Sequence, residues 1–482
     1  MTRVAELEAV IGLEIHVQLA TRTKMFCGCA LSFGDEPNVH TCPVCLAHPG
    51  VLPVVNEQAI RCALQIAAAL ECEVAPRSIF HRKNYFYPDS PKAYQISQYD
   101  IPIAGAGRLG GVRIHRAHLE EDAAKMIHVG ESGRIHGSGA SLVDFNRGGT
   151  PLVEIVTEPD LRSAAEAAAW ARLLRETVRQ LGVSDVNMEE GSLRVDANVS
   201  VRPAGSEELG TKTELKNMNS FRFLERGIEA ELARQRELIE AGGTVIQETL
   251  HFHPEDGTLH PLRSKEEAHD YRYFPEPDLV PIAPTEAMLR EARESLPELP
   301  EARSARYREQ LHLPDDVAAL LAADPETAAY FERAAKAAAG VEPRVVANWV
   351  TGELAAALRQ DGGEASAAES KVEPAALAAL VAMVQEKKIS HGSGKTVLAT
   401  LVAEGGDPAA IVEREGLAQI SDSGELEAIV AAAVESNPEA ADQIRSGNQK
   451  AIGAIVGAVM KETKGRADGG EVTRLIREKL GL

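Results

Sequence analysis

The stretch Val10-Ile-Gly-Leu-Glu-Ile-His-Val-Gln-Leu19 alternates apolar and polar residues along its length. The odd positions from 11 to 17 are apolar, and the even positions include Glu14, His16 and Gln18. A period of two predicts a half-buried strand, whose polar face would carry a carboxylate and an imidazole side by side. A solvated strand face is the alternative reading, because burying such groups without partners is costly.

Similar polar faces recur in later stretches that also have the composition of strands. Their carboxylates belong to Glu121, Glu154, Asp196 and Glu214. Several strands that offer hard oxygen ligands, together with one imidazole, are typical of Mg²⁺ held for nucleotide chemistry. Lys212 and Lys216 lie on the same predicted strand as Glu214, so we expect them to face phosphates.

Length and charge limit the classes of protein that this chain can belong to. Its 482 residues suffice for about two to four domains. The formal net charge of −21 argues against a protein that coats nucleic acid or an anionic membrane. The charge is uneven, since residues 445–482 hold eight Lys or Arg and four Asp or Glu. No apolar leader and no run of roughly 18 apolar residues is visible, so we expect a cytoplasmic protein without a membrane span.

The hydrophobic pattern changes along the chain, from short strands to helices. Short alternating segments between Gly- and Pro-rich turns predict an α+β domain, a mixed or antiparallel sheet with helices over residues 56–71, 163–181 and 220–241. A Pro-rich connector follows, and then an Ala-rich sequence with helical spacing. We therefore predict an α+β domain, an all-α domain and a small all-α tail, over residues 1–295, 296–405 and 406–482.

Four of the cysteines form two close pairs, Cys27 with Cys29 and Cys42 with Cys45. In a cytosolic chain this spacing favours a tetrahedral zinc site over disulfides. Four thiolates leave no open coordination position, so we expect a structural ion that fixes a loop. His40 and His48 are possible substitute ligands, whereas the two other cysteines read as buried small hydrophobes.

Two glycine-rich stretches resemble phosphate-binding loops but lack the right context. Gly105-Ala-Gly-Arg-Leu-Gly110 precedes a strand pattern where the dinucleotide-binding motif needs a helix, so we predict a hairpin turn. Gly392-Ser-Gly-Lys-Thr396 has Ile389 where a P-loop needs its first glycine, so we predict a loop between helices. His251, His253 and His260 could bind a metal, but an exposed hairpin is the preferred reading.

The stretch from residue 83 to residue 97 is dense in aromatic residues in a chain that has few. Tyr85 and Tyr87, with Lys83 and Lys92, suit the stacking of an adenine or a terminal tRNA base while a lysine meets phosphate. The alternative is a loop packed by its own aromatic side chains.

Long motifs over the whole chain resemble the GatB family, the B subunits of the tRNA-dependent aspartyl/glutamyl amidotransferases. The motifs include the two cysteine pairs and the following stretches: residues 12–19, 83–88, 119–125, 144–154, 212–217, 270–279, 347–354 and 451–461. The resemblance implies a cradle domain, a helical domain and a YqeY-like tail. It also implies that ATP phosphorylates the side-chain carboxylate of Glu on tRNA(Gln), or of Asp on tRNA(Asn), and that ammonia displaces the phosphate.

The resemblance also implies roles for particular residues. Magnesium would be held by Glu14, His16, Glu121, Asp196 and Glu214, with Glu120 and Glu154 as further candidates. Lys216 joins these as a catalytic residue, and phosphoryl transfer needs such positive charge. From the chemistry of phosphate and base binding, and less from the resemblance, we expect ATP or substrate to meet Lys83, Tyr85, Tyr87, Lys92, Lys212 and Asn217. The tail would bind the phosphates of tRNA through Lys450, Lys461, Lys464 and Arg466, although the last two could form an ordinary helix end.

Nothing in the sequence has the pattern of a glutamine-hydrolysing amidase or of a lone nucleophilic cysteine with a histidine partner. By the resemblance, a glutaminase, known as the A subunit of these heterotrimers, would therefore supply ammonia, together with a small C subunit. Two other functions remain open at this point. One is a small-molecule carboxylate–amine ligase, and the other is a non-catalytic, zinc-stabilised tRNA-binding protein, which would have no use for clustered carboxylates.

Overall fold

The computed structural model divides the chain into two compact units, residues 1–299 and 300–482, which are described separately. It describes residues 6–129, 138–264, 271–360, 366–418, 423–446, 448–463 and 466–481. No helix in these parts of the chain has both the length and the apolar content to cross a bilayer.

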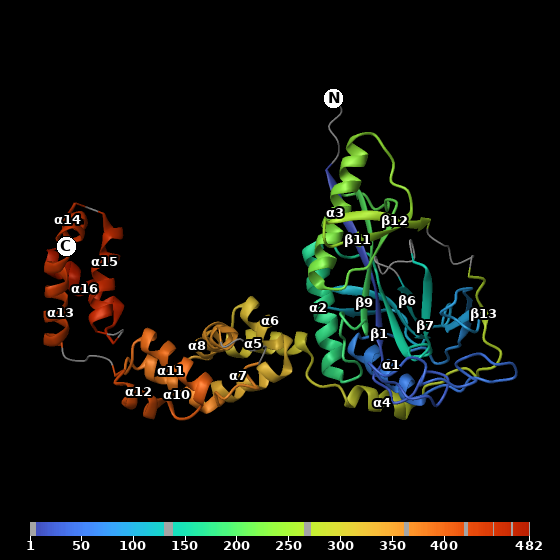
Figure 1. Cartoon of the computed structure of the whole chain (residues 1–482), viewed down its shortest axis with the longest axis horizontal. Coiled ribbons are helices and arrows are strands. Elements are labelled where there is room, and N and C mark those ends of the chain that lie inside the picture. Colours follow the sequence, from blue (N-terminus) through green and yellow to red (C-terminus); the bar gives the residue numbers. More distant parts are fainter. Residues whose placement is uncertain are drawn as a thin grey trace. The chain divides into compact units, whose positions relative to one another are not determined.

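A mixed eight-stranded sheet forms the first unit, and β1 lies near its centre (Figure 1). All neighbouring strands are antiparallel except β10 and β11, which run parallel. The order across the sheet is β12 (Thr258–Ser264), β11 (Glu248–His253), β10 (Thr213–Lys216), β9 (Leu193–Pro203), β1 (Leu7–Gln18), β8 (Pro151–Thr157), β5 (Val112–Glu121) and β4 (Gly107–Leu109).

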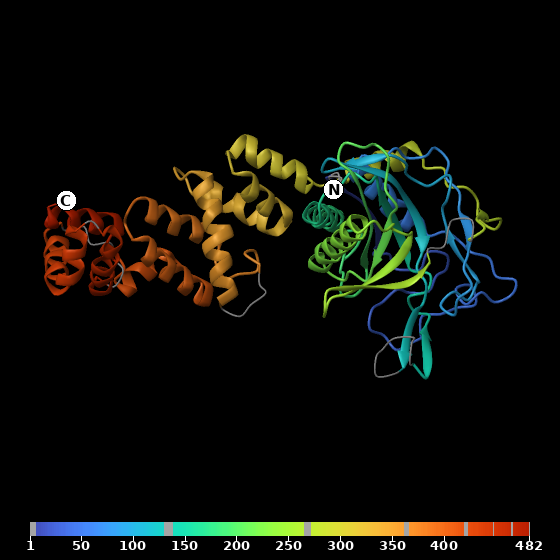
Figure 2. The same cartoon turned by 90° about the horizontal axis from the view of Figure 1, so that it is seen from above.

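The alternation in β1 gives the sheet one apolar and one polar face. Ile11, Leu13, Ile15 and Val17 are at most 1% exposed and belong to the main apolar core. That core also contains buried residues of α1 (Glu57–Ala69), α2 (Ala164–Leu181) and α3 (Phe221–Glu240). In Figure 2 the two green helices α2 and α3 lie on one face of the sheet, and blue N-terminal segments lie beyond the other. The predicted strand and its buried face are confirmed.

The three helices begin where the sequence predicts them to begin. The side chains of Asn56, Ser163 and Ser220 accept hydrogen bonds from the first-turn amides of α1, α2 and α3. These caps satisfy donors that would otherwise have no partner in the helix. Gly182 ends α2 in the left-handed conformation that glycine adopts without strain.

Two hairpins predicted from the sequence are present in the main sheet. The hairpin predicted at residues 105–110 is confirmed, because β4 and β5 are joined by Gly110 and Gly111, both with positive φ. The hairpin around His251 and His260 is confirmed as β11 paired with β12. Two smaller sheets lie outside the main one in the described residues. The first has three strands in the order β13 (Phe274–Pro275), β2 (His81–Asn84) and β3 (Tyr94–Ser97), and the second is a hairpin of β6 (Lys125–Val129) and β7 (Ala140–Asp144).

Where the second unit is described, its regular elements are helices, as predicted. Its first apolar core gathers α5 (Pro300–Leu311), α6 (Asp315–Ala323), α7 (Pro325–Ala337), α8 (Pro343–Asn348), the π-helical η1 (Trp349–Leu354), α9 (Ala355–Gln360), α10 (Pro374–Gln385), α11 (His391–Glu404) and α12 (Pro408–Glu415). A separate core joins α13 (Ser423–Ser436), α14 (Pro438–Arg445), α15 (Ile452–Glu462) and α16 (Gly469–Leu480), with the short η2 (Gln449–Ala451) between them. α4 (Glu286–Glu294) packs on α1 in the first unit.

One sequence prediction is wrong in the second unit, and the start of the tail stays a prediction. The stretch Gly392–Thr396 is not a loop, because Ser390 caps α11 and places these residues in its first turns. The predicted tail at residues 406–482 includes α12, yet Ile411 and Val412 pack in the core of the preceding helices. The division into three domains itself stays a prediction.

Candidate active site

The polar face of the main sheet brings charged side chains from five strands together. Glu14 pairs across the strands with Asp196, and His16 pairs with Glu154 on one side and Arg194 on the other. Since directly opposed residues share a face, these groups project the same way. They continue on β5 through Glu120 and on β10 through Lys216.

A cavity of about 460 Å³ opens over this face, and we call it the hollow. Its wall includes sheet residues and segments that lie above the sheet. Of the residues proposed from the sequence, it is lined by His16, Lys83, Tyr85, Lys92, Glu120, Glu121, Asp196, Lys216 and Asn217. Tyr87 and Lys212 are not among the lining residues, and both are exposed. Glu14, Glu154 and Glu214 do not line the hollow either, so they lie beside it on the sheet. The ring of Tyr87 lies 5.9 Å from that of Tyr85.

Two groups of side chains have ligand atoms close enough to share one metal ion. Glu14, His16 and Asp196 form the first group, and His16, Glu120 and Glu154 form the second. Within each group the potential ligand atoms lie within 4.8 Å of one another. The structure thus brings together three of the five residues expected to hold magnesium. It adds Glu120 and Glu154, which the sequence had ranked as further candidates.

Glu121 and Glu214 do not join either group. The Glu121 carboxylate lies 2.5 Å from the Lys92 ammonium and accepts a hydrogen bond from the Ile96 amide. Glu214 is buried on β10, where it accepts a hydrogen bond from Thr249 at 2.9 Å. Both carboxylates are therefore engaged by other partners, and their assignment as magnesium ligands stays a prediction that these contacts do not favour.

The two groups crowd carboxylates around the imidazole of His16. Burial, Glu154 and Asp196 together raise the pKa of Glu14. Burial alone would lower the pKa of His16, but its hydrogen bond to Glu154 and the charge of Glu14 outweigh burial and raise it to about 9. Carboxylates crowded in this way repel one another, and a divalent cation with oxygen ligands would offset that repulsion.

Lysines around the hollow are held in their cationic form. The ammonium of Lys83 lies 4.8 Å from the centre of the Tyr271 ring, a distance typical of a cation–π contact. Burial opposes the charge on Lys83, but Glu120 and Glu154 raise its pKa above the usual range. The ammonium of Lys216 lies 2.6 Å from the Asp196 carboxylate. Burial would lower the pKa of Lys216, but the charge of Asp196 outweighs burial and raises it.

Sequence reasoning missed Arg194 and Asp122 as part of this site. Both line the hollow, and a guanidinium nitrogen of Arg194 donates to the Asp122 carboxylate at 3.0 Å. The Nε atom of Arg194 is buried without a hydrogen-bond partner. The signal was present, because Arg194 precedes Asp196 by two residues on a strand with period two and must share its face.

The four predicted zinc ligands come together in the loops beside the hollow. The Sγ atoms of Cys27, Cys29, Cys42 and Cys45 all lie within 4.8 Å of one another. Those of Cys42 and Cys45 are 3.9 Å apart, close to the sulfur–sulfur distance of about 3.8 Å in a tetrahedron of Zn–S bonds. The residues present therefore fit zinc. The hydrogen bond between Cys27 and Cys45 lowers the pKa of Cys45 and raises that of Cys27, so the pair shares a proton when no metal is bound.

The basic residues proposed for the tail lie in different surroundings. Lys450 and Lys461 are exposed, on η2 and at the end of α15. Arg466 is half-buried and its Nε donates to the Thr463 carbonyl at 3.1 Å, which is the helix-end role left open from the sequence. Lys464 lies outside the described residues.

Comparison with known proteins agrees with this geometry. Residues 9–290 match the family described as the GatB/GatE catalytic domain, and residues 329–480 match one described as the GatB domain. The chain belongs to the GatB family. Proteins named as the B subunit of aspartyl/glutamyl-tRNA(Asn/Gln) amidotransferase are similar over nearly their whole length. The protein of Brevibacillus brevis is 49% identical, over 99% of both chains. That of Geobacter sulfurreducens is 50% identical, over 98% of this chain and 99% of its own.

The two family matches cover different parts of the chain. The matched catalytic domain spans the main sheet, the hollow and the four cysteines. The second match begins within α7 and covers the rest of the first helical core and the whole of the separate core. The carboxylate groups thus lie within the part of the chain that the family description calls catalytic.

Proposed function

We propose that this chain amidates misacylated tRNA, converting Glu on tRNA(Gln), Asp on tRNA(Asn), or both, into Gln and Asn. ATP would transfer its terminal phosphoryl group to the side-chain carboxylate and leave as ADP. Ammonia would then attack the acyl carbon and expel inorganic phosphate, which leaves the amide. The names of the similar proteins support the substrate, and the carboxylate groups of the hollow support the phosphoryl-transfer step.

The observation that carries this proposal is the convergence of Glu14, His16 and Asp196 beside Glu120 and Glu154. We propose that they hold magnesium, which when bound neutralises charge on the transferring phosphoryl group. We further propose that zinc binds the four clustered cysteines and fixes their loops.

The remaining residues of the hollow would bind and orient the substrates. Lys83, Lys216 and Arg194 supply fixed positive charge where phosphate oxygens would lie. Tyr85 and Tyr271 offer ring faces on which an adenine or a terminal base could stack. Because Lys216 and Arg194 are already held by the main sheet and Lys83 by β2, little reorganisation of these charges is needed when substrate enters.

Ammonia must come from outside this chain. We propose that two further proteins complete the enzyme, a glutaminase (the A subunit) with a small C subunit. A protein similar to B subunits implies such partners, and the sequence offers no amidase nucleophile. A substrate charged for translation would be met in the cytoplasm. The exposed Lys450 and Lys461 would bind the phosphates of the tRNA.

The test is a transamidation assay on the chain purified with its A and C partners. Radiolabelled Glu-tRNA(Gln) is given ATP, Mg²⁺ and ammonium chloride, and the amino acid released from the tRNA is identified. We expect labelled Gln that depends on ATP. We expect Glu14→Gln and Asp196→Asn to reduce its rate by roughly 100-fold or more, since each removes a charged oxygen ligand of the proposed magnesium, which offsets charge on the phosphoryl group.

The matched control is Glu8→Gln, on the same strand β1 as Glu14. The Glu8 carboxylate pairs with Arg202 and belongs to neither of the two carboxylate groups, so we expect its rate to equal that of the wild type. Unchanged Glu on tRNA that remains bound would contradict catalysis and leave a tRNA-binding protein. Equal amidation of unattached glutamate would favour a small-molecule ligase.

A further inference from the structure

Lys24 is a buried lysine beside the cysteine cluster, and neither the sequence nor the proposed chemistry accounts for it. Its side chain is among the most buried in the protein, with the residue only 1% exposed. The Nζ atom lies 3.7 Å from Sγ of Cys45 and 2.8 Å from the carbonyl oxygen of Phe145. Among the described residues, no carboxylate oxygen lies within 4.0 Å of this nitrogen.

A buried ammonium needs a compensating negative charge. Without one, the cost of taking it out of water is several kcal/mol in real proteins. The Phe145 carbonyl offers a dipole but no charge, so the Cys45 sulfur is the neighbouring atom that can supply the charge, as a thiolate. The backbone of Lys24 is also held by the cluster, because its amide donates to the Cys29 carbonyl at 3.0 Å.

The charge of a filled cluster would complement this ammonium. Four thiolates around one divalent zinc carry a net charge of about −2, and a single buried lysine offsets part of it. Groups that donate hydrogen bonds to metal ligands orient them and typically change metal affinity by about 10–100-fold. The amide of Cys42 also donates to Cys45, at 3.2 Å, so this sulfur receives two such contacts.

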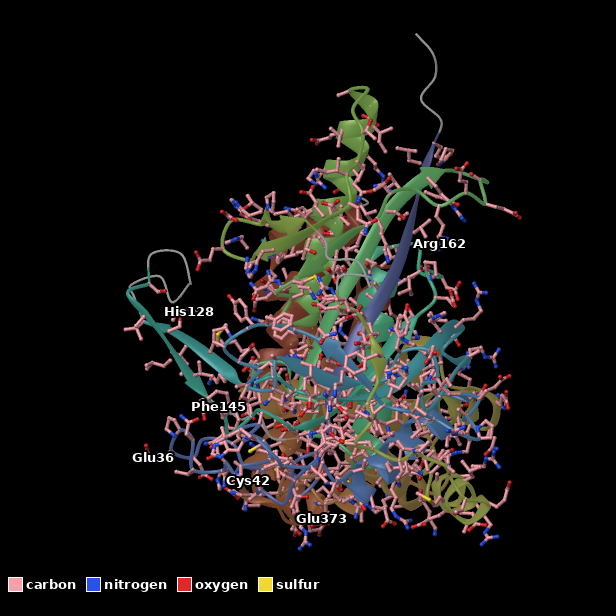
Figure 3. The ribbon with its side chains drawn as sticks, turned by 90° about the vertical axis from the view of Figure 1, so that its right-hand side faces the viewer. Glu36, Cys42, His128, Phe145, Arg162 and Glu373 are labelled. Carbon is pink, nitrogen blue, oxygen red and sulfur yellow. The ribbon has the colours of Figure 1, made fainter. Side chains whose placement is uncertain are left out.

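We propose that Lys24 is a positioning residue that holds Cys45 as a zinc-bound thiolate. The inference rests on the zinc site proposed above and assigns a further residue to it. Because Lys24 also binds Phe145, at the base of the β6–β7 hairpin, it ties the cluster to that hairpin (Figure 3). Gly149 packs against the lysine, since a Cβ there would be in ordinary van der Waals contact, 3.4 Å from its Cδ.

The proposal has a mechanical consequence for the hollow. Cys45 lines the hollow on one side and, on the other, a second cavity of about 210 Å³. The position of its side chain therefore shapes the wall between the two cavities. Zinc held through Lys24 would fix that wall, although neither residue touches the carboxylate groups.

The test compares zinc affinity in the full chain with Lys24→Met, Lys24→Arg and Lys371→Met. Apoprotein is titrated with zinc in competition with a chromophoric chelator, and the absorption spectrum is recorded with cobalt in place of zinc. We expect Lys24→Met to bind zinc about 10–100-fold more weakly and to shift the cobalt spectrum. We expect Lys24→Arg to restore part of the affinity. Lys371 donates to the Ala403 carbonyl, so its substitution should change nothing.

A second measurement needs no variant and covers the case in which Lys24→Met does not fold. Lysine acylation of the wild type is mapped by mass spectrometry before and after zinc is removed. We expect Lys24 to be protected with zinc and labelled without it. Equal labelling in both states, or equal zinc affinity in wild type and Lys24→Met, would overturn the role of Lys24 while leaving the zinc site. A wild type that binds no zinc would overturn both.

Discussion

Asp122 is the residue on which the orientation of Arg194 depends. Its carboxylate is buried and accepts hydrogen bonds from Gln18 at 2.6 Å and from Arg194 at 3.0 Å. Arg194 lowers the pKa of Asp122 against the effect of burial, so the group stays ionised. Hydrogen bonds to charged groups contribute about 1.5–3 kcal/mol each. We therefore expect Asp122→Asn to lower kcat/KM of ammonium-dependent transamidation by roughly 10–100-fold.

The control is an aspartate with the same partner type outside the hollow. Asp160 holds the guanidinium of Arg113 through contacts of 2.6 and 2.9 Å, and neither residue lines the hollow. We expect Asp160→Asn to leave kcat/KM unchanged. If the two variants lose activity equally, the effect of Asp122 is one of general stability and the role given to Arg194 is wrong.

At the scale of single residues, the sequence could name the ligand types but not choose between neighbours. Glu120 and Glu121 are adjacent on β5, so they point to different surroundings. Glu120 joins His16 and Glu154, whereas the Glu121 carboxylate, which also lines the hollow, meets Lys92. The choice depends on the register of β5 against β8, which a single strand pattern does not contain.

Strand β1 carries site residues on its polar face and core residues on its apolar face. We therefore expect its apolar face to control the stability of the first unit. Ile15 is fully buried between the sheet and its helices. Removing such a side chain leaves a cavity and costs about 2–5 kcal/mol. We expect Ile15→Ala to lower the midpoint of thermal unfolding of the first unit, measured by calorimetry, and to leave the transition of the helical unit in place.

A matched control for this prediction lies on β6. Ile127 is 44% exposed on the hairpin, so Ile127→Ala makes the same chemical change without opening a buried cavity. We expect its unfolding midpoint to stay within error of the wild type. An equal fall in both variants would show that β1 is not the stabilising centre of the sheet.

Elements with clear caps and periodicity were predicted correctly, and α11 shows why others were not. Its first turns contain Gly392 and Gly394, which disfavour a helix by local propensity. A Cβ on Gly394 would lie 2.8 Å from Val384 and 3.0 Å from Trp349. Close packing therefore requires glycine inside the helix, and such tertiary contacts are invisible in a local pattern.

At the scale of the whole molecule, the change from strands to helices was readable from composition, but the start of the tail was not. Gly405 and Gly406 have positive φ and mark a real break in the chain. The helix that follows still buries Ile411 and Val412 in the preceding core, and the next core begins only at Leu426. A turn signal locates the end of a helix, whereas a domain boundary depends on which core the next helix joins.

The separate core of the tail makes its removal a test of substrate class. Deleting residues 423–482 removes α13 to α16 and leaves α12 within the other helical core. We expect the KM for Glu-tRNA(Gln) to rise by about tenfold or more, because the phosphate contacts of Lys450 and Lys461 are lost. The KM for ATP and the kcat at saturating tRNA should stay near the wild-type values, since the hollow is built from the first unit.

Salt dependence separates an electrostatic role of the tail from a merely structural one. The logarithm of the affinity for tRNA falls linearly with the logarithm of the salt concentration. Each lost phosphate contact should make the slope of that line less negative by about one unit. Lys450→Gln with Lys461→Gln should reproduce part of that change in a chain of full length, whereas Lys336→Gln, a lysine on α7, serves as the control. If the deletion leaves the KM for Glu-tRNA(Gln) and its salt slope unchanged, the tail does not bind tRNA, and the recognition of the substrate must lie elsewhere in the enzyme.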